Sequence, residues 1–298
     1  MVPQDRLLRL YPIAAIILLI HCVGAITQAQ NRIDPAQVSI VYRVPKMEQV
    51  TVHRGIVFDN MAGKPLALDA YIPHRAGKGE RLPSIVFVSG AEYVRQWRWF
   101  ITWGQLAAAH GIVGIVPDKR YQRGLDGIRT GFEDTEKLLT YLRTNSDRLG
   151  IDPQRICLWT FSAGGRLTSM GLNPGAPTVR CLVSFYGVLD LSQEFAAIGD
   201  ERERDSLLKR YSPLHVLEST VNSGGKVPPI LIGRAGKDTP FINSGIDKFA
   251  ATALRSNVTL TVMNYPEGDH GFDALNDTPQ SRAIIKAALQ FIIDKALE

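Results

Sequence analysis

The sequence predicts an α/β protein built on a mainly parallel β-sheet with helices on both faces. Short apolar runs rich in Val and Ile alternate with amphipathic helical patterns along most of the chain. The runs lack polar alternation, so both faces of these strands should be buried. No repeat, low-complexity tract or linker splits the series, which indicates one domain over residues 30–298.

The two strands nearest the N-terminus should form a hairpin and give the sheet an antiparallel edge. Val50–Phe58 and Leu66–Ile72 are separated by Asn60–Lys64, a turn that contains Gly63. The remaining predicted strands are Ser84–Ser89, Ile112–Val116, Arg155–Trp159, Cys181–Phe185, Ile230–Ile232 and Val258–Met263, and the predicted helices are Trp99–His110, Leu125–Leu149, Phe241–Ser256 and Pro279–Leu297.

One charged segment does not follow this alternation. Gln193–Val227 lies between two predicted strands, is helical in parts and is too long for a simple crossover. It is interpreted either as a small cap or rim over a pocket, or as a plain surface excursion.

The N-terminus has the features of a secretory signal peptide. Arg6 and Arg9 precede the apolar run Ile13–Ile20, which Cys22–Ile26 continues. Small residues follow at Thr27-Gln28-Ala29, or alternatively at Val23-Gly24-Ala25. The run is shorter than a membrane-spanning helix requires, with an uncleaved anchor as the alternative. We therefore expect residues 1–29 to be a leader and the protein to be secreted or periplasmic, with membrane contact only through an uncleaved leader.

The composition is that of an ordinary globular protein. The chain has 298 residues, 45% of them hydrophobic and 21% charged, which is enough for a large core. Its net charge of +5 is mild, and Lys and Arg are spread along the chain rather than clustered. We therefore expect no nucleic-acid partner.

The stretch that points to chemistry is Thr160-Phe161-Ser162-Ala163-Gly164, at a predicted corner between strand and helix. It matches the G-x-S-x-G nucleophile elbow except at Thr160, and Gly165 doubles the second glycine. Such a corner exposes the serine oxygen at the sheet edge, beside the positive end of the following helix. Ser162 is therefore the predicted nucleophile, with a plain turn as the alternative.

A serine hydroxyl is a weak nucleophile without a base, and His270 is the candidate base. It lies in the Gly-rich loop Glu267–Phe272 after the last predicted strand. The other histidines lie in the leader, near early strand ends, at a helix end or in the charged segment. Flanking glycines would let the imidazole reach over a neighbouring strand.

The base in turn needs an acid that orients its ring, and Asp238 is the candidate. Asp238 follows the strand before the histidine loop, so the chain order is Ser, Asp, His, as in hydrolases. Asp190, after the preceding strand, is the alternative acid. Asp269 and Asp273 are close to His270 in sequence and are interpreted as loop caps.

Two backbone N–H groups should form an oxyanion hole. One belongs to Ala163, directly after the nucleophile, and the other to Ala91, with Gly90 as second choice, in the loop after the third strand. Three tryptophans follow that loop and are interpreted chiefly as core packing, with an acyl or sugar wall as the alternative: Trp97, Trp99 and Trp103.

Two cysteines remain beyond the leader, Cys157 and Cys181, each in a predicted strand. A disulfide is possible in an exported protein if these strands are neighbours. Because disulfide geometry is demanding, two buried free thiols are favoured.

With Ser162, Asp238 and His270 assigned, the chain resembles the α/β-hydrolase superfamily. The likeness is closest to dienelactone-hydrolase-like proteins and small serine esterases with an F-S-A-G-G motif. It extends from about Val50 to the end of the chain. The motifs that carry it are Phe161–Gly165, Gly236-Lys237-Asp238 and Asp269–Phe272. It implies an eight-stranded sheet, no metal or organic cofactor, and cleavage of a small-molecule ester through an acyl-enzyme.

The chain departs from that family pattern in two places. Dienelactone hydrolases carry a cysteine where this chain has Ser162, and many of the esterases have His-Gly-Gly where it has Ser89-Gly90-Ala91. An ordinary carboxylic ester is therefore favoured as substrate. A peptidase or acyltransferase with the same triad is the enzymatic alternative. A catalytically inactive binding protein on a hydrolase scaffold is the non-enzymatic one.

Overall fold

The computed structural model describes residues 34, 36–60, 65–74, 79–120, 124–173 and 179–297. The predicted leader lies outside these residues, as does most of the predicted turn at Asn60–Lys64. In the described part of the chain, no helix combines the length and the apolar character needed to cross a bilayer.

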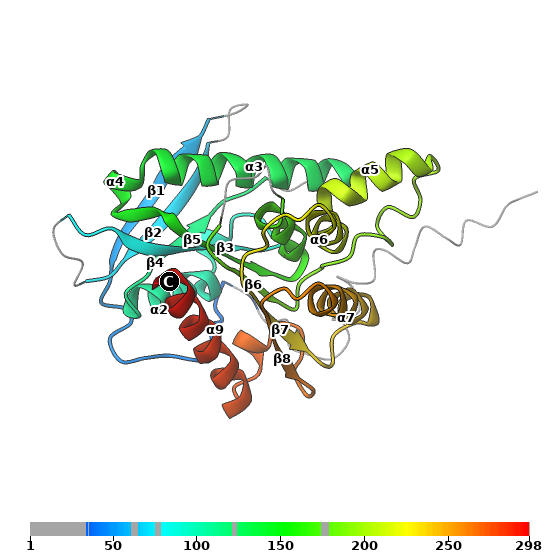
Figure 1. Ribbon diagram of the computed structural model, residues 1–298. Helices are drawn as coiled ribbons and strands as arrows, with labels where there is room; N and C mark the ends of the chain where they lie inside the picture. The colour runs from blue at the N-terminus through cyan, green and yellow to red at the C-terminus, as the bar shows by residue number, and fades with distance from the viewer. Residues whose placement is uncertain are drawn as a thin grey trace, which may run out of the picture.

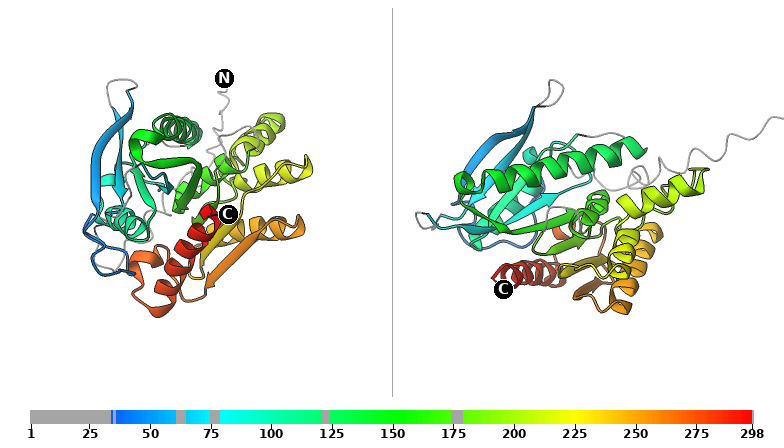
Figure 2. Two further views of the ribbon diagram at one scale, coloured as in Figure 1. Left: turned by 60° about the vertical axis from the view of Figure 1, so that its left-hand side comes forward. Right: turned by 45° about the horizontal axis from the view of Figure 1, so that its top comes forward.

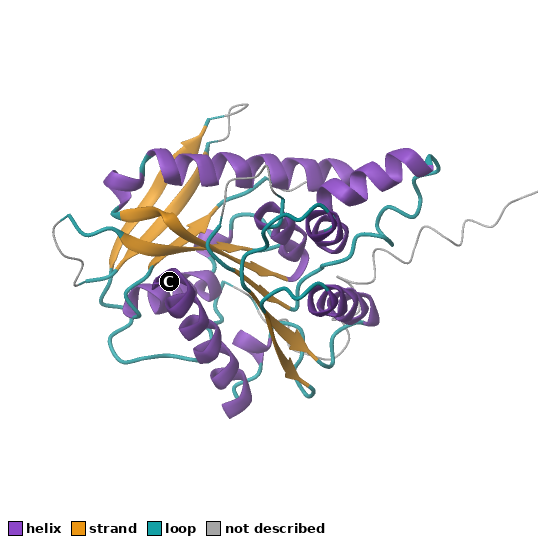
Figure 3. Cartoon of the chain, in the orientation of Figure 1, coloured by secondary structure: helices purple, strands orange, loops and turns teal. Residues whose placement is uncertain are grey.

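The described residues form one eight-stranded sheet with the strand order β1-β2-β4-β3-β5-β6-β7-β8 (Figures 1 and 3). β1 pairs antiparallel with β2, and β2 pairs antiparallel with β4, while all other neighbours are parallel. The strands are β1 (Thr51–Asp59), β2 (Leu66–Ile72), β3 (Leu82–Val88), β4 (Val113–Pro117), β5 (Ile151–Phe161), β6 (Leu182–Phe185), β7 (Ile230–Ala235) and β8 (Leu260–Tyr265). The predicted hairpin and the parallel sheet that follows it are both confirmed.

Helices cover both faces of this sheet (Figure 2). The described helices are the 3₁₀ helices η2 (Val94–Gln96) and η3 (Ser162–Gly171) and the α-helices α2 (Arg98–Ala109), α3 (Gly124–Thr144), α4 (Ser146–Leu149), α5 (Glu201–Tyr211), α6 (Pro213–Asn222), α7 (Pro240–Arg255), α8 (Phe272–Leu275) and α9 (Pro279–Leu297). Ile85 and Phe87 of β3 belong to the core that includes α2 and α9, whereas Val86 and Val88 belong to the core that includes α3, η3, α6 and α7. Successive side chains of a strand point to opposite faces, so an unbroken apolar run fills both cores.

The predicted helix Leu125–Leu149 is two helices in the structure. α3 ends at Thr144 and α4 begins at Ser146, with Asn145 between them at φ −107° and ψ 19°. The Asn145 side-chain amide donates to the carbonyl of Tyr141 at 3.0 Å. The Asn145 N–H donates to the same carbonyl at 2.9 Å, so the helical bond is kept and the side chain shares its acceptor. Asparagine favours helix ends over helix interiors, and apolar periodicity does not reveal such a break.

The charged segment Gln193–Val227 supplies α5 and α6. Leu214, Val216 and Leu217 of α6 are buried in the same core as η3 and α7. The segment therefore contributes to the layer of helices that covers one face of the sheet, and α5 extends this layer outward (Figure 1).

The interpretation of Cys157 and Cys181 as free thiols is wrong, because the structure joins them in a disulfide. β5 and β6 are parallel neighbours in which Leu158 pairs with Leu182, so the preceding cysteines also lie side by side. Their Cα atoms are 4.9 Å apart, within the usual range for a disulfide. Sequence alone did not establish this register.

Removing the disulfide is expected to destabilise the fold by about 3 kcal/mol, the chain-entropy value for a loop of about this length. The bridged residues are 24 positions apart. Urea unfolding of C157A, C181A and the double variant under oxidising conditions measures the effect. A bridge predicts that each single variant loses nearly as much stability as the double variant. Additive losses would contradict it.

Candidate active site

The predicted elbow is a sharp corner at the end of β5. The strand ends at Phe161, and Ser162, the first residue of η3, takes φ +54°. A non-glycine residue in the left-handed region is uncommon and strained, and such residues cluster at functional sites. Ser162 therefore lies at the carboxyl end of a central parallel strand, where ligands bind in open α/β sheets.

Two glycines let the chain turn this closely. A methyl group at Gly164 would lie 2.5 Å from the carbonyl oxygen of Val88, and one at Gly165 would lie 2.4 Å from the backbone nitrogen of Val188. Neither position has room for a side chain. Thr160, at the first glycine position of the pattern, is fully buried, and its hydroxyl lies 3.0 Å from that of Thr168 on η3.

The three predicted triad residues lie together in one hydrogen-bonded chain. His270 Nε2 is 2.8 Å from Ser162 Oγ, and His270 Nδ1 is 2.6 Å from Asp238 Oδ2. The Asp238 side chain is 2% exposed, whereas that of His270 is 32% exposed. An ionised carboxylate only accepts hydrogen bonds, so Nδ1 carries the proton and Nε2 accepts the serine proton.

The loop after β7 holds Asp238 in place through its backbone. Asp238 Oδ1 accepts from the Thr239 N–H at 2.7 Å. The Asn243 side-chain amide donates to the carbonyl oxygens of both Gly236 and Asp238, at 3.3 Å each. The acid is thus fixed by the start of α7 rather than by the histidine alone.

The alternative acid, Asp190, lies in another network. Its Oδ1 accepts from the Ser192 N–H and hydroxyl at 2.9 and 2.6 Å, and its Oδ2 accepts from Lys248 Nζ at 2.9 Å. Burial raises the pKa of Asp190, but these partners outweigh it and hold the pKa below its ordinary value. The contacts of its carboxylate are thus with α7 and its own loop.

The two acids near His270 in sequence have different roles. Asp269 closes the loop as predicted, because its N–H and carboxylate both bond the Asn276 side-chain amide at 2.8 Å. The interpretation of Asp273 as a loop cap is wrong. Asp273 is fully buried, and no side-chain hydrogen bond caps α8. Asp273 follows a short Gly-rich loop, which usually lies at the surface, so the sequence gave no sign that this side chain is buried.

The two predicted oxyanion segments are adjacent. A methyl group at Gly90 would lie 3.2 Å from the backbone nitrogen of Ala163, so the loop after β3 packs directly against the elbow. The N–H of Ala91 donates to Ser89 Oγ at 3.1 Å in this structure. Ala91 would serve as an oxyanion donor by exchanging that hydroxyl for a substrate oxygen.

Comparison with known proteins assigns the family. The model of the BD-FAE family matches residues 68–239, which is more than half of the chain. The chain belongs to the BD-FAE family. The match begins in β2 and ends just after Asp238, so it includes the elbow and the acid but not His270.

This BD-FAE chain is similar to two curated proteins over part of their length. An acetylxylan esterase of Xylanibacter ruminicola is 27% identical over 174 residues, which are 54% of this chain and 35% of that protein. The prolyl endopeptidase FAP of Bos taurus is 26% identical over 220 residues, which are 69% of this chain and 29% of that protein. The matched segments thus amount to about a third of each relative.

Solved structures share the fold of the BD-FAE chain over most of its length. The propionate-bound esterase Est2 of the planctomycete Thermogutta terrifontis superposes with a TM-score of 0.66 at 21% identity, covering 84% of this chain and 96% of that one. The same enzyme phosphoramylated by tabun gives a TM-score of 0.66 at 20% identity, with the same coverage. The predicted α/β-hydrolase fold is therefore confirmed.

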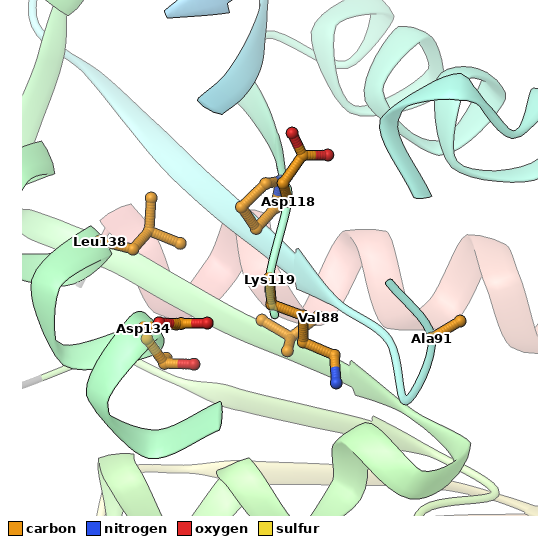
Figure 4. A pocket seen from close by; sticks show the side chains of 8 residues that line it. Val88, Ala91, Asp118, Lys119, Asp134 and Leu138 are labelled. Atoms are coloured by element: carbon orange, nitrogen blue, oxygen red, sulfur yellow. The ribbon is translucent and has the colours of Figure 1, made fainter. Parts of the chain in front are cut away.

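One residue of the BD-FAE site was missed from the sequence. Lys119 follows β4, and its Nζ donates to the carbonyl of Gly90 at 3.1 Å. Figure 4 shows Lys119 passing Val88 with its amine towards the loop that carries Ala91, in a narrow cavity that both residues line. The sequence feature that could have indicated this role is the position of Lys119 just after the carboxyl end of the predicted strand Ile112–Val116.

The charge of Lys119 is sensitive to its surroundings. Burial lowers the pKa of Lys119 to about 8, and the nearby Arg166 adds to this effect, whereas Asp134 and Glu92 oppose it. Lys119 is therefore a cation at neutral pH and loses its charge in the mildly alkaline range.

Proposed function

We propose that this chain is a serine esterase that hydrolyses a carboxylic ester through an acyl-enzyme. The observation that carries the proposal is the hydrogen-bonded chain Ser162–His270–Asp238, closed by distances of 2.8 and 2.6 Å. These distances are within the range that a general base and its orienting acid require.

The chemistry follows from the direction of the protons. Ser162 Oγ attacks the ester carbonyl carbon while its proton passes to His270 Nε2. The tetrahedral intermediate collapses, and His270 returns the proton to the departing alcohol. A water molecule then attacks the acyl-enzyme carbonyl and gives its proton to His270. When the second tetrahedral intermediate collapses, His270 passes this proton to the departing Ser162 Oγ, which restores the hydroxyl and releases the acid. Asp238 stabilises the imidazolium through the Nδ1–H bond in both steps.

Backbone donors at the elbow stabilise the oxyanion in this mechanism. The Ala163 N–H follows the nucleophile, and Gly90, which precedes Ala91, packs against Ala163. The Ala163 N–H needs no reorganisation when the negative charge develops, whereas the Ala91 N–H must first release Ser89 Oγ. The names of the relatives, an acetylxylan esterase and a propionate-bound esterase, support a substrate with a short acyl group.

A labelling and substrate experiment on residues 30–298 tests the proposal. A fluorophosphonate probe should modify Ser162, located by peptide mass mapping. The panel contains p-nitrophenyl acetate, acetylated xylo-oligosaccharides, a dienelactone and a prolyl peptide. We expect labelling and release of acetate. Peptide cleavage alone would instead support the peptidase alternative. Absence of both labelling and turnover would support a binding protein.

The subtype and location are proposed on separate grounds. The serine nucleophile favours an ordinary ester over a dienelactone, and the dienelactone arm of the panel tests this. The leader-like residues 1–29 and the disulfide both support export from the cytoplasm. N-terminal sequencing of exported protein would show a start near residue 30, whereas retention of the full chain in the cytoplasm would contradict export.

Lys119 should give the reaction an alkaline decline. Its ammonium donates to the Gly90 carbonyl, which belongs to the same peptide group as the Ala91 N–H, so it polarises that group towards an oxyanion. As pH rises through about 8, Lys119 loses its proton and kcat should fall. K119M should lower kcat at pH 7 by about 10-fold, less than loss of an oxyanion donor, and abolish the decline.

The matched control for this prediction is K248M, which removes a lysine bound to Asp190. K248M should keep the wild-type pH profile. An alkaline decline that persists unchanged in K119M would contradict the role of Lys119.

A further inference from the structure

A fully buried carboxylate lies three residues after the catalytic histidine. Asp273 accepts three hydrogen bonds: from the Tyr186 hydroxyl at 2.5 Å, from Trp99 Nε1 at 2.8 Å and from Trp103 Nε1 at 2.9 Å. The donors come from α2 and from the end of β6, and all three are uncharged. They converge on one side chain of α8.

Stability alone does not account for an acid at this position. Burial raises the pKa of the Asp273 carboxyl, and the hydrogen bonds from Tyr186 and the two tryptophans only partly oppose that rise. A buried charge with uncharged partners is costly relative to an apolar side chain of similar volume. Buried polar groups of this kind often fix one arrangement of their neighbours.

The first neighbour that Asp273 fixes lies against the base. The Tyr186 ring is 4.7 Å from the His270 ring, centroid to centroid, at an interplanar angle of 56°. Tyr186 also has φ +40°, which is strained for a bulky residue. Its hydroxyl bond to Asp273 and its N–H bond to the Gly233 carbonyl, at 2.7 Å, hold it in that conformation.

The second neighbour packs on the residue that follows the base. A methyl group at Gly271 would lie 2.8 Å from a ring carbon of Trp99, so this partly exposed ring covers the Gly271 backbone. The Trp99 indole is fixed by its bond to Asp273. The Asp273 carboxylate therefore fixes the positions of two rings. The Tyr186 ring packs against the imidazole of His270, and the Trp99 ring packs against Gly271.

We propose that Asp273 is a positioning residue for the base, which through Tyr186 and Trp99 holds the His270 imidazole within reach of Ser162. The inference rests on the proposed esterase function. In this proposal the Tyr186 ring supports the imidazole by packing against it, and Asp273 holds that ring in place through the Tyr186 hydroxyl. Displacing a base by about 1 Å can reduce turnover about 100-fold without preventing substrate binding.

Two variants separate this role from simple stability. Y186F keeps the ring but removes the hydroxyl. In D273N the amide oxygen can still accept from both tryptophans, but the NH₂ group cannot accept the Tyr186 proton. We expect kcat to fall about 10-fold in Y186F and up to about 100-fold in D273N, with little change in KM. Y186F keeps the test decisive if D273N fails to fold.

The matched control is Y265F, which removes another tyrosine hydroxyl bond beside α8. Tyr265 bonds Thr278 at 2.9 Å, and its ring packs on Phe272 much as that of Tyr186 does. Y265F should lower the melting temperature but leave kcat at the wild-type value. If Y186F and D273N behave like Y265F, Asp273 is only structural and the proposal is wrong.

A measurement without substrate separates this proposal from the esterase proposal. The proton between His270 Nδ1 and Asp238 Oδ2 should give a far-downfield resonance in the proton NMR spectrum, because the bond is short and charge-assisted. We expect this resonance to broaden or vanish in Y186F and D273N but not in Y265F. An unchanged resonance in Y186F would overturn the proposal. Absent ester turnover in the wild type would overturn only the proposed function.

Discussion

Replacing Ser162 by alanine is expected to lower kcat for p-nitrophenyl acetate by about 10⁴- to 10⁶-fold, as in serine hydrolases that lose their nucleophile. The variant keeps the elbow and the oxyanion donors but cannot form an acyl-enzyme. The hydroxyl that lies 2.8 Å from His270 Nε2 in the wild type is absent from the variant, so His270 can only activate water directly. Steady-state kinetics with subtraction of spontaneous hydrolysis measures the loss.

The variant needs a control for folding and for removal of a hydroxyl as such. S192A removes a hydroxyl that bonds Asp190 outside the triad, at 2.6 Å. It should keep kcat within about twofold of the wild type, as for substitutions away from the chemistry. Turnover by S162A within tenfold of the wild-type rate, at an unchanged melting temperature, would remove Ser162 from the mechanism.

Replacing Asp238 by asparagine is expected to lower kcat by about 10⁴-fold while KM changes little. The asparagine amide can donate to Nδ1, which would place the imidazole proton on Nε2. That nitrogen could then no longer accept the Ser162 proton. The side chain of Asp238 is 2% exposed, so water cannot take over the role of the carboxylate. The pH dependence of kcat and KM for D238N measures both effects.

D190N is the matched comparison, because it makes the same change in the alternative acid. Asp190 binds Ser192 and Lys248, so its loss should affect stability more than turnover. We expect D190N to keep kcat within about twofold of the wild type. A loss in D190N equal to that in D238N would contradict the assignment of the acid.

Much of the site could be predicted because its parts are local. The elbow can be recognised in the sequence from Ser162 and the two glycines that follow it. Close packing leaves no room for a side chain at Gly164 or Gly165, so the fold requires glycine at both positions. The histidine loop and the acid loop each follow a strand, and parallel strands bring such loops to one edge. Chain order then made Asp238 the candidate acid and His270 the candidate base, with Asp190 left as the alternative acid.

Other parts could not be predicted because they depend on distances between distant segments. Asp273 lies 174 residues from Trp99, and only the packing of α2 against α8 brings them together. The disulfide depends on the register of β5 against β6, and a shift of one residue would separate the cysteines. Lys119 depends on how the loop after β4 meets the loop after β3.

By itself the sequence determined the succession of strands and helices along the chain and the burial of both faces of the sheet. It also determined the three connections that carry Ser162, Asp238 and His270. These follow from apolar periodicity and turn chemistry, which act over a few residues. The tertiary structure decided which acid meets His270, that Cys157 and Cys181 are bonded, and that Asp273 is buried with its carboxylate bonded to Tyr186 and two tryptophans. Those outcomes are set by register and packing between elements far apart in the chain, which local patterns do not encode.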